Sequence, residues 1–251
     1  GIIVALLVVV LVGYIYLFTG SKIKNVSNDV IKGEEGTKSL VIYFTRQGEI
    51  PGNVDAVSSA TQNSNEGMDG SDTEAAARMI QSLTGADLYQ IYTEHYYRKS
   101  FAGTAATAWI EEQLNLRPKL AAKPDNLDDY DTIYVGYPIW WFNAPMAIGS
   151  FLESYDLSGK TIVPFCTSQD NDISVSMDYI KEVASGANVL DGYRIHGADV
   201  DDVKEWLQRI GVLNDNNTEN QNAEGSLEMK TKKSDKNYES ATIPDELEYI
   251  P

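Results

Sequence analysis

The residues best suited to chemistry lie in three loops, each of which follows a predicted buried strand. The first loop holds Thr45, Arg46 and Gln47, and it resumes at Ser71 and Thr73, where a predicted helix begins. Hydroxyl groups and the amides of a helix N-terminus can bind an anion such as phosphate without a cluster of basic side chains. The alternative interpretation is a capped helix that follows an ordinary polar loop.

The second loop is aromatic and covers residues 136–145, GYPIWWFNAP, in which Pro138 and Ile139 precede Trp140 and Trp141. Exposed aromatic rings at a strand end offer flat, apolar faces on which a planar ring can stack. The alternative is that one tryptophan folds back and fills the core. Two adjacent tryptophans cannot easily both do so, so we expect at least one of them to be available for binding.

The third loop is polar and covers residues 167–172, TSQDND, beginning with Thr167, Ser168 and Gln169. Its backbone amides and side chains could bind the polar edge of a heterocycle. The alternative is a solvated turn whose Asp and Asn side chains cap the next helix.

The composition excludes several other kinds of chemistry. The single cysteine, Cys166, excludes an intramolecular disulfide and a thiolate metal cluster, and two histidines, His95 and His196, leave little for a His-based metal site. With 37 acidic and 20 basic side chains, the net charge is −17, which argues against nonspecific binding to nucleic acid. We therefore assign no catalytic side chain and no metal ligand, and expect the chemistry to come from a bound cofactor.

Alternating elements must position these loops. A capping box at 71–74, SDTE, opens one helix, and apolar residues at helical spacing continue it to Gly85. Short β-branched and aromatic runs predict strands at 39–45, 87–92, 131–137, 160–166 and 188–195, and helical spacing predicts further helices within 96–116, 144–155, 173–184 and 200–210. This alternation predicts an α/β fold, a doubly wound, mostly parallel sheet in a three-layer sandwich, in which ligands bind beyond the carboxyl ends of the strands.

The ends of the chain differ from this domain. Residues 2–18 are apolar and uncharged, and the length of this run favours a single-pass membrane anchor at 1–20 over a cleaved signal peptide. We expect a linker at 21–38, the α/β domain at 39–211 and a polar tail at 212–251. The lysines after the span favour a cytoplasmic domain, but a basic segment before it would reverse this orientation, so the side of the cell membrane stays open.

Five segments resemble the flavodoxin-like family, and specifically the bacterial flavodoxins that carry a YPxWW loop. They are VIYFTR (41–46), SDTEAAARMI (71–80), TGADLYQI (84–91), VGYPIWWFNAP (135–145) and LSGKTIVPFCTS (157–168). The resemblance implies a five-stranded sheet in the order 2-1-3-4-5 that binds one FMN noncovalently. It also implies that the FMN phosphate lies on Thr45, Arg46, Gln47, Ser71 and Thr73, the isoalloxazine ring against Trp140 or Trp141, and the ring edge near Thr167, Ser168 and Gln169.

Three hypotheses on function follow. The first is a membrane-anchored, FMN-binding electron carrier, whose acidic charge suits redox partner proteins with basic docking patches. The second is an FMN-dependent oxidoreductase acting between NAD(P)H and a quinone or similar acceptor. The third is a flavodoxin fold that has lost FMN and acts as a tethered binding module. It is motivated by residues 48–70, which split the phosphate loop, by Ser71-Asp72 in place of the family's Gly-Asn, and by the lack of glycine in the third loop.

Overall fold

The computed structural model describes residues 22–23, 26–46, 71–98, 100–125, 127–195 and 200–213. The predicted anchor at 1–20, Gln47 with the rest of the split loop, His196 and the predicted tail from residue 214 onward lie outside these residues. Within them, no helix is both long enough and apolar enough to cross a bilayer.

The central sheet contains the predicted parallel strands in the predicted order. Its parallel strands are β1 (Ser39–Phe44), β2 (Asp87–Thr93), β4 (Thr132–Pro138), β5 (Thr161–Thr167), β6 (Asn188–Val189) and β7 (Tyr193–Ile195). The order is β2-β1-β4-β5, with β6 and β7 both paired to β5. Almost every residue of β1, β4 and β5 is buried, because helices cover both faces of the sheet. The α/β prediction and the 2-1-3-4-5 order are therefore confirmed.

The sheet differs from the five-stranded prediction in two places. The expected fifth strand at 188–195 is divided into β6 and β7, which pair with opposite ends of β5. The division lies beside Pro164, which has no backbone N–H to donate to a neighbouring strand. The second difference is β3 (Leu120–Ala122), a short antiparallel strand on the outer edge of β2. The three residues of this strand, LAA, show no recognisable alternation, so it was not predicted from the sequence.

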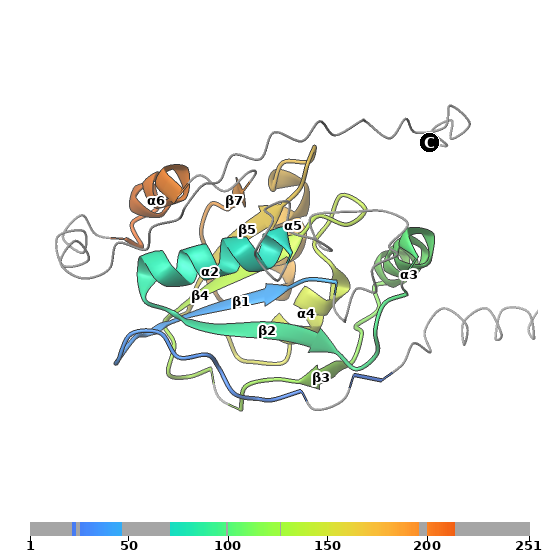
Figure 1. Ribbon diagram of the computed structural model, residues 1–251, viewed down its shortest axis with the longest axis horizontal. Helices are drawn as coiled ribbons and strands as arrows, with labels where there is room; N and C mark the ends of the chain where they lie inside the picture. The colour runs from blue at the N-terminus through green and yellow to red at the C-terminus, as the bar shows by residue number, and fades with distance from the viewer. Residues whose placement is uncertain are drawn as a thin grey trace, which may run out of the picture. The chain divides into compact units, whose positions relative to one another are not determined.

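Among the described residues, four helices cover the faces of the sheet (Figure 1). Helices α2 (Asp72–Thr84) and α6 (Val200–Arg209) share one apolar core with the sheet, and α4 (Met146–Leu152) and α5 (Ser174–Val183) share the other. The N-cap bond of the predicted capping box forms, since the Ser71 hydroxyl accepts the Glu74 amide at 3.2 Å, while the Glu74 carboxylate binds Arg78. At the other end of α2, Gly85 has a positive φ of 67°, a conformation in which glycine avoids the steric cost of a Cβ atom.

Helix α3 (Phe101–Gln113) lies beyond the carboxyl ends of the strands rather than on a face of the sheet (Figure 1). The segment that leads from β2 into α3 meets the segment that leads from α3 into β3 at this end of the sheet. The Glu94 amide of the first segment donates to the Lys119 carbonyl of the second at 2.6 Å. The helix therefore borders the edge at which the three loops were expected to form a site.

The segment at 26–38 packs along the first half of the outer edge of β2, whose second half pairs with β3. Ile31 forms an antiparallel bridge with Leu88, and the buried Asp87 carboxylate accepts both the Gly33 amide and the Lys32 ammonium group at 2.8 Å. A Cβ atom on Gly33 would lie only 2.2 Å from backbone oxygens of the α2–β2 turn, so this close approach requires glycine. The predicted domain boundary at residue 39 stays a prediction, but this part of the expected linker contacts the domain closely.

Candidate functional site

Hydroxyl pairs join the first and third loops at the carboxyl edge of the sheet. The Thr45 hydroxyl donates to Ser71 Oγ at 2.7 Å, and Thr73 Oγ1 lies 2.7 Å from Thr167 Oγ1. All four residues are buried. The two pairs join residues 26 and 94 positions apart in the sequence, and the four side chains form one cluster at the N-terminus of α2. The structure thus brings together these four of the predicted phosphate-binding and ring-edge residues.

The chemistry of this hydroxyl cluster suits a phosphate ester. Hydroxyl groups can rotate to donate to phosphate oxygens, and the positive end of the α2 dipole favours a negative charge at this point. Arg46, the residue that follows Thr45 in the chain, is also buried. The nearby Glu74 carboxylate pairs with Arg78 at 2.8 Å, which offsets its charge. Gln47, the remaining predicted phosphate ligand, lies outside the described residues.

The aromatic loop is held in an unusual backbone conformation. Trp140 and Asn143 exchange backbone hydrogen bonds of 2.9 and 3.0 Å, which closes a two-residue turn over Trp141 and Phe142. Both of these residues have positive φ, at 50° and 62°. Bulky residues rarely adopt this conformation because Cβ crowds the backbone. Strain of this kind is concentrated at functional sites, so the turn is a candidate for ligand contact.

The two adjacent tryptophans take different positions. The Trp140 ring packs edge-to-face on Phe44 at 5.5 Å and on Tyr97 at 5.2 Å, measured between ring centroids. Trp141 remains 47% exposed, and its indole N–H donates to the Ala105 carbonyl of α3 at 2.8 Å. Trp140 therefore takes the inward, packed position, while Trp141 offers an exposed ring at the carboxyl edge.

The second and third loops lie side by side where they leave β4 and β5. Pro138 pairs with Thr167 across β4 and β5, and the Ile139 amide donates to the Thr167 carbonyl at 3.1 Å. Ser168 is buried and its hydroxyl accepts the Asn171 amide at 2.9 Å, so this side chain stabilises the turn. Gln169 is exposed, with its carbonyl held by Arg194 at 3.0 Å.

The helix-capping interpretation of the third loop holds in part, because the N-cap Ile173 makes no side-chain cap and Asp172, the residue before it, accepts a helix amide. Asp172 accepts the Ser174 amide at 2.9 Å at the start of α5. Hydrogen bonds from the Ser174 backbone and side chain lower the pKa of the Asp172 carboxyl. This acidic side chain thus has a structural role, while Thr167 and Gln169 remain at the edge of the candidate site.

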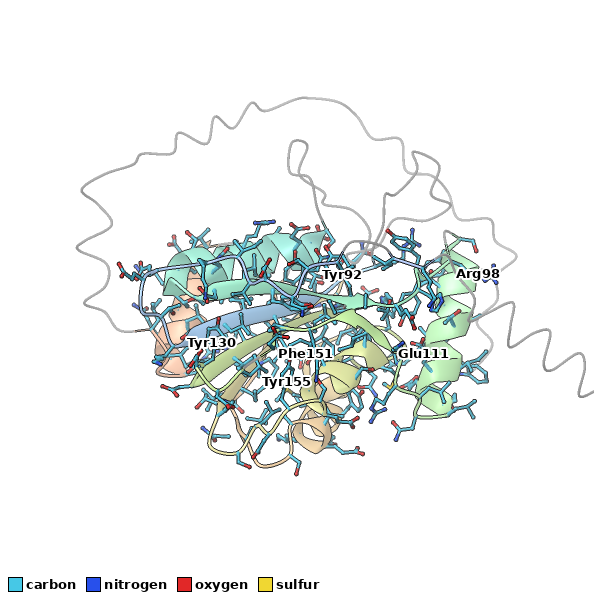
Figure 2. The ribbon with its side chains drawn as sticks, turned by 90° about the horizontal axis from the view of Figure 1, so that it is seen from below. Tyr92, Arg98, Glu111, Tyr130, Phe151 and Tyr155 are labelled. Atoms are coloured by element: carbon cyan, nitrogen blue, oxygen red, sulfur yellow. The ribbon has the colours of Figure 1, made fainter. Side chains whose placement is uncertain are left out.

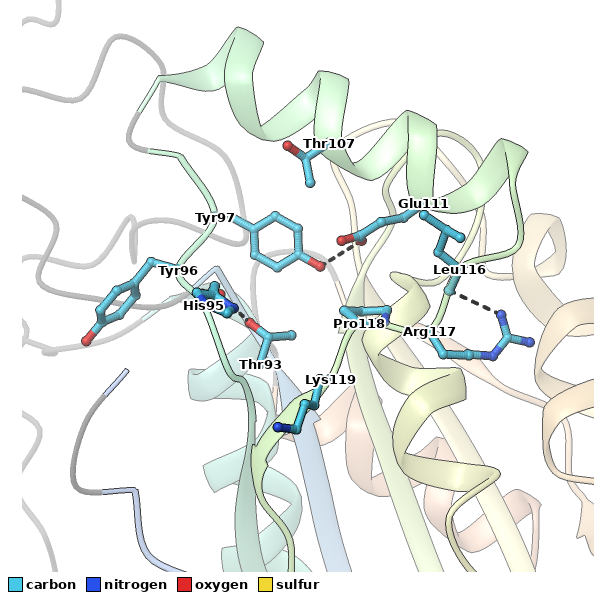
Figure 3. Close-up of a pocket in the computed structure, with 10 residues that line it drawn as sticks. All are labelled: Thr93, His95, Tyr96, Tyr97, Thr107, Glu111, Leu116, Arg117, Pro118 and Lys119. Atoms are coloured by element: carbon cyan, nitrogen blue, oxygen red, sulfur yellow. Dashed lines mark hydrogen bonds between the residues drawn. The ribbon is translucent and has the colours of Figure 1, made fainter. Parts of the chain in front are cut away.

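A cavity of about 260 Å³ lies between the end of β2, α3 and the segment before β3, and Tyr97, which lines it, also packs on Trp140 (Figure 3). The Glu111 side chain points into it from α3 and accepts the Tyr97 hydroxyl at 2.8 Å. Glu111 is only 4% exposed, and this burial raises the pKa of its carboxyl to about 7. The cavity is lined by Thr93, His95, Tyr96, Tyr97, Thr107, Glu111, Leu116, Arg117, Pro118 and Lys119.

This cavity was not predicted from the sequence. Glu111 and Glu112 are neighbours on α3, and only packing shows that the first of them is buried. The histidine to which no role was assigned, His95, lines the cavity wall. Cys166 is a core residue, as the sequence suggested, and burial raises the pKa of its thiol to about 12.

Comparison with known proteins identifies relatives over most of the domain. A flavodoxin family profile matches residues 67–210. A protein from Bacteroides eggerthii, described as a flavoprotein, is 29% identical, and the match covers 69% of this chain and 98% of that chain at a TM-score of 0.56. A Bacteroides uniformis protein described in the same way is 30% identical, with coverages of 69% and 99% and a TM-score of 0.55.

A flavoprotein from Lactobacillus acidophilus, solved in complex with FMN, is 22% identical, with coverages of 68% and 98% and a TM-score of 0.48. No curated protein matches the chain.

Proposed function

Because the chain belongs to the flavodoxin family, we propose that it is an FMN-binding electron carrier tethered to a membrane by residues 2–18. FMN is the cofactor that this membership supports, and when bound it supplies reversible uptake and release of electrons. Flavodoxin-like proteins generally transfer electrons to redox partners, and the net charge of −17 suits partners that dock through basic patches.

One observation carries the proposal, namely that the buried hydroxyl cluster and the exposed Trp141 ring lie at the same edge of the sheet. Thr45, Ser71, Thr73 and Thr167 would hold the phosphate, and Trp141 would cover one face of the ring. The backbone of residues 167–169 would meet the polar edge of the ring. Trp140 would support this site from behind, through its contacts with Phe44 and Tyr97.

An FMN titration of the full chain in detergent tests this proposal. We expect the chain to quench the fluorescence of added FMN and to bind one equivalent. Replacing Thr73 with valine keeps the shape of the side chain but removes its hydroxyl, so we expect weaker binding of FMN and a smaller effect on riboflavin, which lacks the phosphate. If the folded chain quenches the fluorescence of neither FMN nor riboflavin, the result would instead support a tethered binding module that has lost FMN.

The cavity that contains Glu111 favours a second candidate function, an oxidoreductase that acts on a small acceptor. The Tyr97 ring separates this cavity from Trp140, so a molecule bound there would lie next to the aromatic loop. Oxidation of NAD(P)H by the purified FMN-loaded chain, without a partner reductase, would favour this function. A requirement for a separate reductase would favour the electron carrier.

A further inference from the structure

The outer side of α3 and the aromatic turn form an apolar surface. Phe101 and Trp109 of α3 are 52% and 48% exposed, and Trp141 and Phe142 of the turn are 47% and 59% exposed. We call these four residues the aromatic surface. Large exposed apolar patches commonly mark contact with a protein or a membrane.

The geometry of α3 joins these residues into one patch. Residues four apart lie on the same side of a helix, so Phe101 and Trp109 flank Ala105 by one turn each. Trp141 is hydrogen-bonded to the carbonyl of that same Ala105. Residues 101–110, FAGTAATAWI, include no ionisable side chain, although Phe101, Ala102 and Trp109 are exposed. A helix that faces only water normally presents charged residues on its outer side.

The chain that follows the predicted span is held at the same edge of the sheet. Lys22 forms a backbone bridge with His95 and an ion pair of 2.7 Å with Glu94, and the Ile23 amide donates to the Glu94 carbonyl at 2.9 Å. His95 is two residues from Tyr97, whose ring contacts Trp140 beside the aromatic turn. The attachment point therefore lies at the carboxyl end of β2, and Tyr97 connects this strand end to the aromatic turn through Trp140.

The length of the connection limits how the domain can be oriented. The apolar run ends at Phe18, four residues before Lys22. Four residues extend at most about 14 Å. If residues 2–18 span a bilayer, the membrane surface lies within that distance of the edge that carries the candidate FMN site. The opposite edge, where Tyr130 lies in Figure 2, cannot face the bilayer over so short a connection.

We propose that the aromatic surface rests in the interfacial layer of the lipid bilayer, so that the FMN-binding edge of the domain faces the membrane. This inference depends on the membrane tether in the proposed function. Trp and Phe rings favour the interface between water and hydrocarbon. Lys22 and Lys119, both more than half exposed and both paired with Glu94, lie at the same edge and can approach lipid phosphates.

Site-directed spin labelling of the full chain in phosphatidylcholine–phosphatidylglycerol vesicles tests the inference. A label at Ala102→Cys, an exposed position on α3, keeps all four aromatic residues. A matched label at Ser158→Cys lies in the exposed turn before β5, at the opposite edge. The native Cys166 is buried, so it should take up little label. We expect the Ala102 label to gain contact with oxygen and lose contact with a water-soluble nickel complex, while the Ser158 label stays in water.

Introducing negative charge on the aromatic surface strengthens this measurement. With Phe101→Glu and Trp109→Glu together, the Ala102 label should return to water, whereas Ile31→Glu, at an equally exposed apolar residue beside the first half of β2, should leave it in the membrane. FMN affinity should be unchanged in both variants.

The outcomes separate the inference from the function on which it rests. If the chain does not float with the vesicles, the tether fails and the inference fails with it, while FMN binding can still be measured. If the chain floats but the Ala102 label is as accessible to water as the Ser158 label, only the inference is overturned. Strong dipolar coupling between Ala102 labels would show that a second copy covers the surface, which also overturns it.

Discussion

The different positions of Trp140 and Trp141 predict that their replacements have separable effects. Trp141 is 47% exposed, and a tryptophan side chain has about 250 Å² of surface, so about 120 Å² is available to a ligand. At about 25 cal/mol per Å², covering all of it would contribute about 3 kcal/mol, and covering one face about 1.5 kcal/mol. Trp141→Ala should therefore raise the Kd for FMN about tenfold.

Trp140→Ala should instead reduce stability. The substitution removes two edge-to-face contacts, with Phe44 and Tyr97, and leaves a cavity behind the aromatic turn. We expect a loss of about 3 kcal/mol in the free energy of unfolding. Urea unfolding of the apo-protein measures this loss, and fluorescence titration with FMN measures affinity under conditions in which both variants are folded.

Trp141→Phe is the matched control, because it keeps an aromatic face but removes the indole N–H that binds the Ala105 carbonyl. Its affinity for FMN should stay within about threefold of the native value, since the stacking face is preserved. The reasoning is refuted if Trp141→Ala binds FMN with native affinity, or if Trp141→Ala destabilises the apo-protein more than Trp140→Ala does.

Three further predictions concern the hydroxyl cluster and two buried carboxyl groups. Thr73→Val should lower the free energy of unfolding by about 1–2 kcal/mol, because Thr167 loses a buried hydroxyl partner; urea unfolding of the apo-protein against Thr73→Ser checks this. Burial raises the pKa of Asp87, but hydrogen bonds from Lys32, Tyr130 and the Gly33 amide outweigh it and lower the pKa below 3.8. The ionised Asp87 carboxylate should therefore contribute its full stabilisation above pH 3.8, and this contribution should be lost as the pH falls through the lowered pKa. Acid-unfolding curves of Asp87→Asn should lack this loss. Burial raises the pKa of Glu111 from 4.5 to about 7, so its effect on stability should be most favourable below pH 4.5 and decline up to pH 7. The free energy of unfolding should fall by about 3 kcal/mol between these pH values in the native chain, and Glu111→Gln should lack this fall. Equal pH profiles of stability for the native chain and Glu111→Gln would contradict the burial argument.

The strands and most helices could be predicted because their signals are local. The buried runs of β1, β4 and β5 and the capping box of α2 depend on neighbouring residues, and their predicted positions agree with the structure to within a few residues. The division of the fifth strand opposite Pro164 could not be predicted in the same way, because it depends on a residue in the adjacent strand.

The candidate site was predictable to a similar extent. Parallel strands place their carboxyl ends at one edge, so the three loops were expected to meet there, and the Thr45–Ser71 and Thr73–Thr167 hydrogen bonds join two of them. Periodicity could not distinguish Trp140 from Trp141, because their difference arises from Phe44, Tyr97 and α3, which are distant in the sequence.

Local residue types are sufficient to predict the α/β alternation and the loops that bear the candidate ligands, because periodicity and strand-end position depend on neighbouring residues, and the family resemblance adds the strand order. The packing of distant segments settles which tryptophan is exposed, that Glu111 is buried beside a cavity, and that α3 lies beyond the sheet. These features depend on contacts between segments far apart in the chain. The attachment of Lys22 next to His95 is of the same kind, since it depends on chain pairing across 72 or more residues.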